Sequence, residues 1–379
     1  MIASETRSIP FFDYPHLFRS EEQELTTIFR DVGLRGAFIL QEDLVLFERN
    51  LASYVGVKYA VGVGNATDGL LLALRAANIG RGDEVIFCSH TMVATAAAIY
   101  FTGATPIAVE CGADHLMDPG AVEAAVTRRT RAILPTHLNG RTADMQALDA
   151  IARRYGLIVI EDAAQALGSR FQGRRAGSFG AAAAFSFFPA KTLGCLGDGG
   201  AIATNSDEIY QRVIELRDHG RGPDGEIVSW GLNSRLDNLQ AAILDYRLAS
   251  YDGVIERRRA LAACYRSGLQ SIKEIKPPPG PEANSDHFDC FQNYEIEAER
   301  RDELRAWLQT RLIGSALPWG GKAVHQWPRL GLNARLPYTE ALFESVLLLP
   351  LNLSLTDYDV RHICITIQDF YQRSYRERV

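Results

Sequence analysis

The 379-residue chain lacks several features that mark particular classes of protein. No apolar run approaches the roughly 18 residues of a membrane span. The six cysteines are scattered without a CxxC pair, and the eight histidines do not cluster at ligand spacing. We therefore expect reduced thiols and no metal site. The opening residues, MIASETRSIPFF, lack a basic segment followed by an apolar one, so we expect no secretory signal and a cytoplasmic location.

The chain also lacks an excess of positive charge. It has 40 basic and 46 acidic residues, a formal net charge of −6, so it has no electrostatic footprint for nucleic acid. Apolar residues make up 47% and charged residues 23%, which is typical of a globular protein. Few of the basic residues are lysines, so a reaction that needs a lysine has few candidates. The five lysines are Lys58, Lys191, Lys273, Lys276 and Lys322.

Short apolar runs rich in β-forming residues dominate the first part of the chain. Helical patterns such as 67–78 and 143–156 lie between them, and this alternation predicts an α/β fold with a mostly parallel sheet buried on both faces. The last two runs are separated by only about a dozen residues, many of them glycine, so we expect the final strand to be antiparallel. The seven runs are 59–63, 85–88, 106–109, 132–136, 157–161, 183–187 and 200–204.

The pattern changes after residue 237. Residues 237–269 predict one long helix or two, and the proline-rich segment 276–285 predicts a loop. A strand at 293–299 and a helix at 301–312 follow. We therefore expect two domains: a large one over residues 1–250 that includes an N-terminal arm, and a smaller α+β domain over residues 251–379.

Polar residues follow two of the predicted strands, at the sheet edge where ligands bind in such folds. Asp162 ends one apolar run and Gln165 follows a turn later; a carboxylate there is either a helix cap or a functional charge. Ser186 and Lys191 follow the next run, in a glycine-rich apolar stretch. The alternative for Lys191 is an ordinary surface lysine, but an apolar setting lowers the pKa of an amine and suits a nucleophile.

A third segment, Gly-Asn-Ala-Thr at 64–67, lies between a strand and a helix. Free N–H groups at a helix start bind phosphate, and Ala66 and Thr67 would supply them. The segment half-matches the dinucleotide-binding fingerprint. That fingerprint needs an acidic residue at the end of the second strand, whereas the acidic pair at 83–84 precedes it. We therefore favour a phosphate site over a nicotinamide site.

These three features together match the needs of pyridoxal 5′-phosphate. Its aldehyde forms a Schiff base with a lysine, its ring nitrogen needs a carboxylate to stay protonated, and its phosphate needs donors at a helix start. At these residues the sequence resembles the DegT/DnrJ/StrS family of sugar aminotransferases, over roughly residues 10–375. The resemblance implies fold type I of the pyridoxal phosphate enzymes, the aspartate aminotransferase fold. The segments that carry it are 82–95, 117–145, 159–169, 177–201, 217–220 and 231–244.

The resemblance also implies roles for individual residues at the cofactor. Lys191 resembles the lysine that forms the Schiff base, Asp162 the partner of the ring nitrogen, and Gln165 the residue beside the ring hydroxyl. Met92 stands where relatives usually have an aromatic residue that stacks on the ring, and methionine can pack there. The implied phosphate ligands are Ala66, Thr67, Ser186 and, from the other subunit, Asn233.

A ligand from the other subunit implies a homodimer with composite active sites. Arg235 resembles a residue near the sugar nucleotide, and His90 is a further candidate for the substrate. Segment 318–331 resembles a loop that reaches the sugar nucleotide, which makes Lys322 and His325 candidate contacts; loop packing is the alternative.

The implied reaction is a ping-pong transamination through Lys191, which converts a nucleotide-linked keto-deoxysugar to an amino sugar. The expected donor is glutamate or glutamine, and the pathway is surface polysaccharide (such as O-antigen) or secondary-metabolite synthesis. GDGG at 197–200, where many 4-aminotransferases have a GEGG-like version, favours amination at C3. The alternative is a regulatory protein that binds the cofactor on the same fold without turnover.

Overall fold

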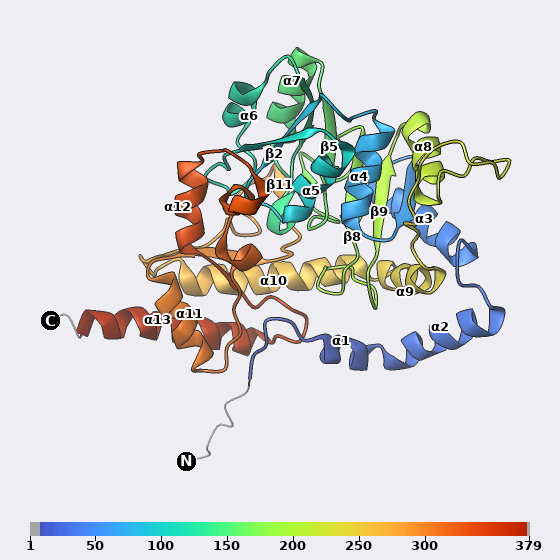
Figure 1. The fold of residues 1–379 in the computed structure, drawn as a ribbon. Coiled ribbons are helices and arrows are strands. Elements are labelled where there is room, and N and C mark those ends of the chain that lie inside the picture. Colours follow the sequence, from blue (N-terminus) through green and yellow to red (C-terminus); the bar gives the residue numbers. More distant parts are fainter. Residues whose placement is uncertain (1–7, 377–379) are drawn as a thin grey trace.

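A seven-stranded sheet forms the centre of the larger part of the molecule (Figure 1). The structure is a computed structural model that describes residues 8–376, so the first seven residues of the predicted N-terminal arm lie outside it. The strand order is β1-β9-β8-β5-β4-β2-β3. The strands are β1 Tyr59–Val63, β2 Glu84–Cys88, β3 Thr105–Val109, β4 Thr130–Leu134, β5 Ile158–Asp162, β8 Ala182–Ser186 and β9 Gly200–Thr204.

The predicted antiparallel strand is confirmed. Strand β9 runs antiparallel to both β1 and β8, whereas β2, β3, β4, β5 and β8 pair in parallel. The segment between β8 and β9 holds no helix, so the chain can only turn back on itself. The start of β9 therefore lies at the same edge as the carboxyl ends of the parallel strands.

Helices cover both faces of the sheet because alternate side chains of each strand point to opposite faces. In β8, Ala182 and Ala184 pack into one core, and Ala183 and Phe185 into another. The first core includes helices α4 Ala66–Ala76, α5 Val93–Thr102 and α8 Asp207–Arg217. The opposite face is covered by α3 Glu42–Val55 and α9 Asn238–Leu248 at one end, and by α6 Pro119–Ala125 and α7 Met145–Tyr155 at the other.

The helical pattern after residue 237 forms two helices. Helix α9 ends at Leu248 and α10 Tyr251–Leu269 begins after a two-residue break. Figure 1 shows α10 running from beneath the large sheet to the C-terminal part of the chain. There it packs on α13 Asp357–Arg376.

A second, antiparallel sheet lies in this C-terminal part, with the strand order β10-β12-β13. The predicted strand is β12 Tyr294–Ala298, flanked by β10 Ile275–Lys276 and β13 Val346–Leu349, and the predicted helix is α11 Arg301–Gln309. Its apolar core also includes Ile9 from the start of the chain. The N–H of Ile9 donates to the Leu312 carbonyl at 2.8 Å, so this N-terminal segment packs with the C-terminal core and not with the large sheet. The domain boundary at residue 250 stays a prediction.

The remaining described elements are short or lie at the periphery. No helix within residues 8–376 is both long and apolar enough to cross a membrane. The elements are α1 Tyr14–Ser20, α2 Glu22–Arg35, α12 Pro337–Ser345, and the small sheet formed by β6 Arg170–Phe171, β7 Arg174–Arg175 and β11 His287–Phe288.

Candidate active site

Asp162 is the last residue of β5 and its carboxylate is held at the carboxyl edge of the large sheet. The residue is only 4% exposed. Its Oδ2 accepts a hydrogen bond from Thr95 Oγ1 in the first turn of α5 at 2.7 Å, and Thr95 in turn pairs with Thr91 Oγ1 at 2.9 Å. The carboxylate therefore has a fixed orientation. The sequence analysis missed Thr95, although a hydroxyl in the first turn of a helix that follows a strand is a signal to look for.

Lys191 lies in the loop after β8, and its amine is free. Within the described residues, Nζ has no hydrogen-bond or ion-pair partner. Burial lowers the pKa of Lys191 to about 8, and the negative charge of Asp162 opposes the shift. Coulombic effects weaken with distance, so the influence of Asp162 on Lys191 indicates that the two groups lie near each other. The amine is thus largely neutral slightly above pH 8, as a nucleophile or proton carrier requires.

One side chain from the distant C-terminal part holds the backbone on both sides of Lys191. Gln292 Oε1 accepts from the Thr192 N–H at 2.9 Å, and Gln292 Nε2 donates to the Ala190 carbonyl at 2.8 Å. Gln292 is 4% exposed, and its own carbonyl accepts from buried Arg258 of α10 at 2.7 Å. The sequence analysis missed this clamp, because nothing in the local sequence links residues a hundred positions apart.

We expect Gln292→Leu to lower both stability and turnover. The change leaves a buried carbonyl and a buried N–H unpaired, which costs about 1–3 kcal/mol of the free energy of unfolding. It also frees the Lys191 loop, and a misplaced reacting group loses roughly 10–100-fold in turnover. Denaturant unfolding and kcat of the purified variant measure the two effects.

A matched control is Gln240→Leu. Gln240 makes the same kind of clamp on Leu196, with contacts of 2.8 Å to its N–H and 3.3 Å to its carbonyl, but away from Lys191. Equal losses of turnover in the two variants would contradict a specific role for Gln292.

The predicted phosphate site has the geometry of an anion cradle. Helix α4 begins at Ala66, so the N–H groups of Ala66 and Thr67 have no acceptor within the helix. Ser186, at the end of β8, pairs with Gly200 of β9. A side chain at Gly200 would lie 2.6 Å from the Asn65 carbonyl carbon, so glycine lets β9 and Ser186 approach the helix start. The structure therefore brings Ala66, Thr67 and Ser186 together.

Gln165 lies in the loop after β5, three residues beyond Asp162, and the backbone of Asn139 holds its side chain. Its Oε1 accepts a hydrogen bond from the Asn139 N–H at 2.8 Å. Asn139 in turn accepts from Asn293 Nδ2 at 2.8 Å. The contact fixes the Gln165 amide after Asp162, at the edge where the ring of a cofactor would lie.

Asn233 and Arg235 lie in the loop before α9. Asn233 is exposed and its backbone pairs with Asp218, whereas Arg235 Nη1 donates to Asp218 Oδ1 at 2.9 Å. An exposed Asn233 can reach a second subunit, but a contact across subunits stays a prediction. Met92 caps α5 and is 48% exposed, so its side chain is accessible at the carboxyl edge.

Segment 318–327 joins the same edge, because the Val324 N–H donates to the Ser89 carbonyl at 3.1 Å. Lys322 is exposed, with Nζ 5.1 Å from the centre of the Trp327 ring. His325 is buried, and its ring contacts Ser89 Oγ at 2.7 Å.

The structure does not support direct substrate contacts by His90 and His325. The His90 side chain is fully buried, and its Nδ1 donates to the His115 carbonyl at 3.2 Å. The His325 ring is engaged by Ser89 and by Glu340, at 3.3 Å. Packing is therefore the better interpretation of both rings in this conformation.

The residues present fit pyridoxal phosphate. A free amine with a lowered pKa, an oriented carboxylate and a helix start with free N–H groups at Ala66 and Thr67 lie along one edge of the sheet, at the ends of β8, β5 and β1. Each group matches a different part of the cofactor: aldehyde, ring nitrogen and phosphate. The contacts of single residues with the cofactor remain predictions.

We expect the lowered pKa of Lys191 to show in the pH dependence of its reactivity. Only the neutral amine reacts with acetic anhydride, so acetylation of Lys191 in cofactor-free protein should rise steeply up to about pH 8 and then level off. Lys276 is the control: burial lowers its pKa, but the hydrogen bond to Glu297 outweighs this and raises it. Its acetylation should still be rising above pH 10. Mass spectrometry of peptides follows both, and parallel profiles would contradict the prediction.

Comparisons with known proteins agree with this geometry. A model of the DegT/DnrJ/EryC1/StrS aminotransferase family matches residues 19–368. The chain is 40% identical over 376 residues to the dTDP-3-amino-3,4,6-trideoxy-alpha-D-glucose transaminase of Streptomyces venezuelae, with 98% of each chain covered.

Two solved structures are also similar. DesV of S. venezuelae, in complex with a ketimine intermediate, has a TM-score of 0.92 and 41% identity, with 96% of this chain and 98% of that chain covered. NtdA of Bacillus subtilis, with bound cofactor PMP, has a TM-score of 0.86 and 28% identity, with 97% and 87% covered.

These likenesses confirm fold type I and the dependence on pyridoxal phosphate that the site geometry indicates. They also make the protein an enzyme, a transaminase. The chain belongs to the DegT/DnrJ/EryC1/StrS aminotransferase family.

Proposed function

We propose that the protein transfers the amino group of glutamate or glutamine to C3 of a nucleotide-linked keto-deoxysugar. The observation that carries the proposal is the free amine of Lys191, with a pKa lowered to about 8, near the oriented carboxylate of Asp162. The relative from S. venezuelae, a 3-amino sugar transaminase by name, supports the sugar class and the position.

The chain's own groups divide the work. Pyridoxal phosphate, when bound, supplies an aldehyde and a ring that stabilises negative charge at the donor carbon. Asp162 holds a proton at the ring nitrogen, with Thr95 fixing the carboxylate. Lys191 Nζ accepts the proton from the donor carbon and returns it, which its lowered pKa allows near neutral pH. The start of α4 and Ser186 bind the phosphate.

The proposal includes a cytoplasmic homodimer in which each subunit completes the partner's site. Asn233 is exposed in the single chain, which leaves it available to a second copy. Large apolar side chains of the N-terminal region are also exposed, as an interface requires: Phe29 is 65%, Leu34 76% and Phe38 57% exposed. Sedimentation at several concentrations tests the dimer.

The first experiment is the absorption spectrum of the purified protein with cofactor, before and after excess glutamate. A bound-cofactor band that shifts on addition of the donor shows the first half-reaction. The loaded enzyme is then offered nucleotide-linked 3-keto and 4-keto sugars, and recovery of the original band identifies the acceptor. Recovery with the 4-keto sugar alone would overturn C3 amination.

The regulatory alternative is not favoured, because the amine, the carboxylate and the free N–H groups at the start of α4 are all present at one edge of the sheet. It makes a different prediction in the same experiment. A regulator without turnover would show the cofactor band but no response to glutamate, glutamine or a keto-sugar.

A further inference from the structure

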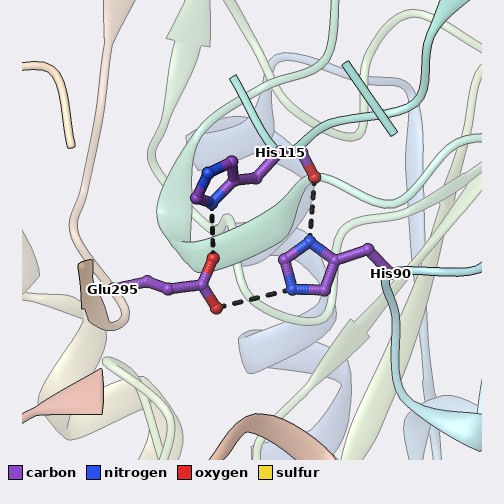
Figure 2. Close-up of side chains that lie close together, drawn as sticks. All are labelled: His90, His115 and Glu295. Atoms are coloured by element: carbon purple, nitrogen blue, oxygen red, sulfur yellow. Dashed lines mark hydrogen bonds and ion pairs between the residues drawn. The ribbon is translucent and has the colours of Figure 1, made fainter. Parts of the chain in front are cut away.

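A second group of polar side chains lies outside the amino-transfer site. His90 follows β2, His115 lies in the loop after β3, and Glu295 comes from β12 of the second sheet (Figure 2). One ligand-type atom from each lies within 4.8 Å of the other two. His115 Nδ1 is 2.7 Å from Glu295 Oε1, and His90 Nε2 is 3.4 Å from Glu295 Oε2. His90 and Glu295 are 1% and 3% exposed.

Two buried atoms of this group are left without a hydrogen bond. They are His90 Nε2 and Glu295 Oε2, which point toward each other (Figure 2). His90 Nδ1 must carry the proton that it donates to the His115 carbonyl, since a carbonyl oxygen only accepts. Burial lowers the pKa of His90, but the charge of Glu295 outweighs this and raises it to about 9, so Nε2 carries a proton at neutral pH that a metal ion would replace. The 3.4 Å ion pair between Nε2 and Oε2 is too long for a good hydrogen bond, and a cation between the two atoms would satisfy both of them better.

The surroundings orient the ligand atoms as a metal site does. Histidine ligands usually donate their second ring nitrogen to a carboxylate or a backbone carbonyl. His90 does so to the His115 carbonyl, and His115 Nε2 is 3.0 Å from Glu297 Oε1. Glu297 is held in turn by Lys276 at 2.5 Å. Both histidines thus have the outer partners that a metal ligand needs.

We propose that His90 Nε2, His115 Nδ1 and the Glu295 carboxylate bind one divalent transition metal ion of the zinc class. Bonds of about 2.0–2.2 Å in a tetrahedral site put neighbouring ligand atoms roughly 3.3–3.5 Å apart. The 3.4 Å between His90 Nε2 and Glu295 Oε2 matches this spacing. The 2.7 Å contact of His115 Nδ1 is with the other oxygen, Oε1, so the carboxylate must rotate or His115 must shift for all three groups to bind one ion. His115 and Glu295 also line a cavity with Asp114 and Lys276, which gives a water molecule access to the fourth position.

The ion would fasten two parts of the fold together. His90 and His115 belong to loops of the large sheet, whereas Glu295 belongs to the second sheet. The sequence analysis expected no metal site, because the ligands are separated by 25 and 180 residues and form no motif. Without the ion, a protonated His115 shared by Glu295 and Glu297 accounts for two of the contacts, and His90 Nε2 then has only its 3.4 Å ion pair with Glu295 Oε2.

The test is zinc binding by the full-length protein with its cofactor bound. The protein is dialysed against a chelator, then against zinc chloride, and its metal content is measured. We expect about one zinc ion per chain and, with Co²⁺ instead, visible absorption bands of a nitrogen- and oxygen-ligated site of low coordination number. Absence of bound metal in the folded wild-type protein would overturn the proposal.

Variants then locate the ion. His90→Gln and Glu295→Gln should abolish the stoichiometric binding. Glu297→Gln, which keeps all three ligands, should weaken it about 10–100-fold. The control is His362→Gln on α13, which should bind zinc as the wild type does.

Circular dichroism and the cofactor band show which variants fold. If Glu295→Gln does not fold, the half-buried Glu297 still gives a measurable change in affinity. Zinc retained at full affinity by His90→Gln and Glu297→Gln would place the ion elsewhere and refute the assignment.

Discussion

Replacing Lys191 with alanine should give a folded protein that has lost at least about 10³-fold in turnover. The residue is the nucleophile and the proton carrier in the proposed reaction, and alanine supplies neither function. Because Nζ has no partner within the described residues, the change breaks no hydrogen bond. Burial also disfavours the charged amine, as its lowered pKa shows. The cofactor-free variant should therefore unfold at the same temperature as the wild type or higher.

The measurements are steady-state turnover and thermal unfolding of cofactor-free protein. Lys273→Ala is the matched control, since Lys273 is exposed on the C-terminal side of α10 and should be silent in both assays. A small primary amine added to the solution should restore part of the activity of the Lys191 variant, because it can carry the same proton. Wild-type turnover in Lys191→Ala would refute the proposed role. A large loss of stability would show that the side chain is structural.

The large sheet could be predicted because its signal is local. Each strand is an apolar run with β-forming residues, and each run is bounded by glycine or polar residues that end it. Even the reversal of β9 follows from the length of one loop. Asp162 and Lys191 could be predicted for the same reason: Asp162 ends a strand and Lys191 lies in the loop after one, so the place of each at the carboxyl edge is known once the strand is known.

The parts that escaped prediction all depend on contacts between distant segments. Gln292 holds the Lys191 loop from a hundred residues away, and Ile9 packs in the core of the C-terminal sheet. His90 was predicted as a substrate contact because it lies in the segment of Met92, where relatives have an aromatic residue at the cofactor, but the loop carrying His115 and strand β12 close over it. A local pattern places a residue at an edge; only the packed fold decides whether its side chain faces solvent or a buried partner.

The Gln292 clamp also bears on how the site works. The amine that carries the proton lies on a loop of the large sheet, but the contacts that fix this loop come from the segment before β12. That segment is held by Arg258, whose guanidinium donates to the carbonyls of Phe291 and Gln292 at 2.8 and 2.7 Å. A displacement of the C-terminal part would therefore also displace the loop that carries Lys191.

Asp162→Asn isolates the contribution of the carboxylate charge. Asparagine has the shape of aspartate and its oxygen can still accept the hydrogen bond from Thr95, so the change loses only the 3.2 Å bond from the Ala164 N–H and the fold should be retained. A neutral amide cannot hold a proton at the ring nitrogen, and loss of one electrostatic stabiliser of this kind costs about 10²–10³-fold in turnover. We expect a loss in this range, measured as kcat for amino transfer from glutamate.

A second pair of variants separates charge from orientation. Thr95→Val removes the hydroxyl that orients Asp162 but keeps the charge, so it should lose less activity than Asp162→Asn. Thr95→Ser retains the hydroxyl, so this variant should keep most of the wild-type activity. If Thr95→Val instead lost as much as Asp162→Asn, orientation would matter as much as charge. If Asp162→Asn kept near-normal turnover, the carboxylate would be a cap at the end of β5, and the ring nitrogen would need no charged partner in this enzyme.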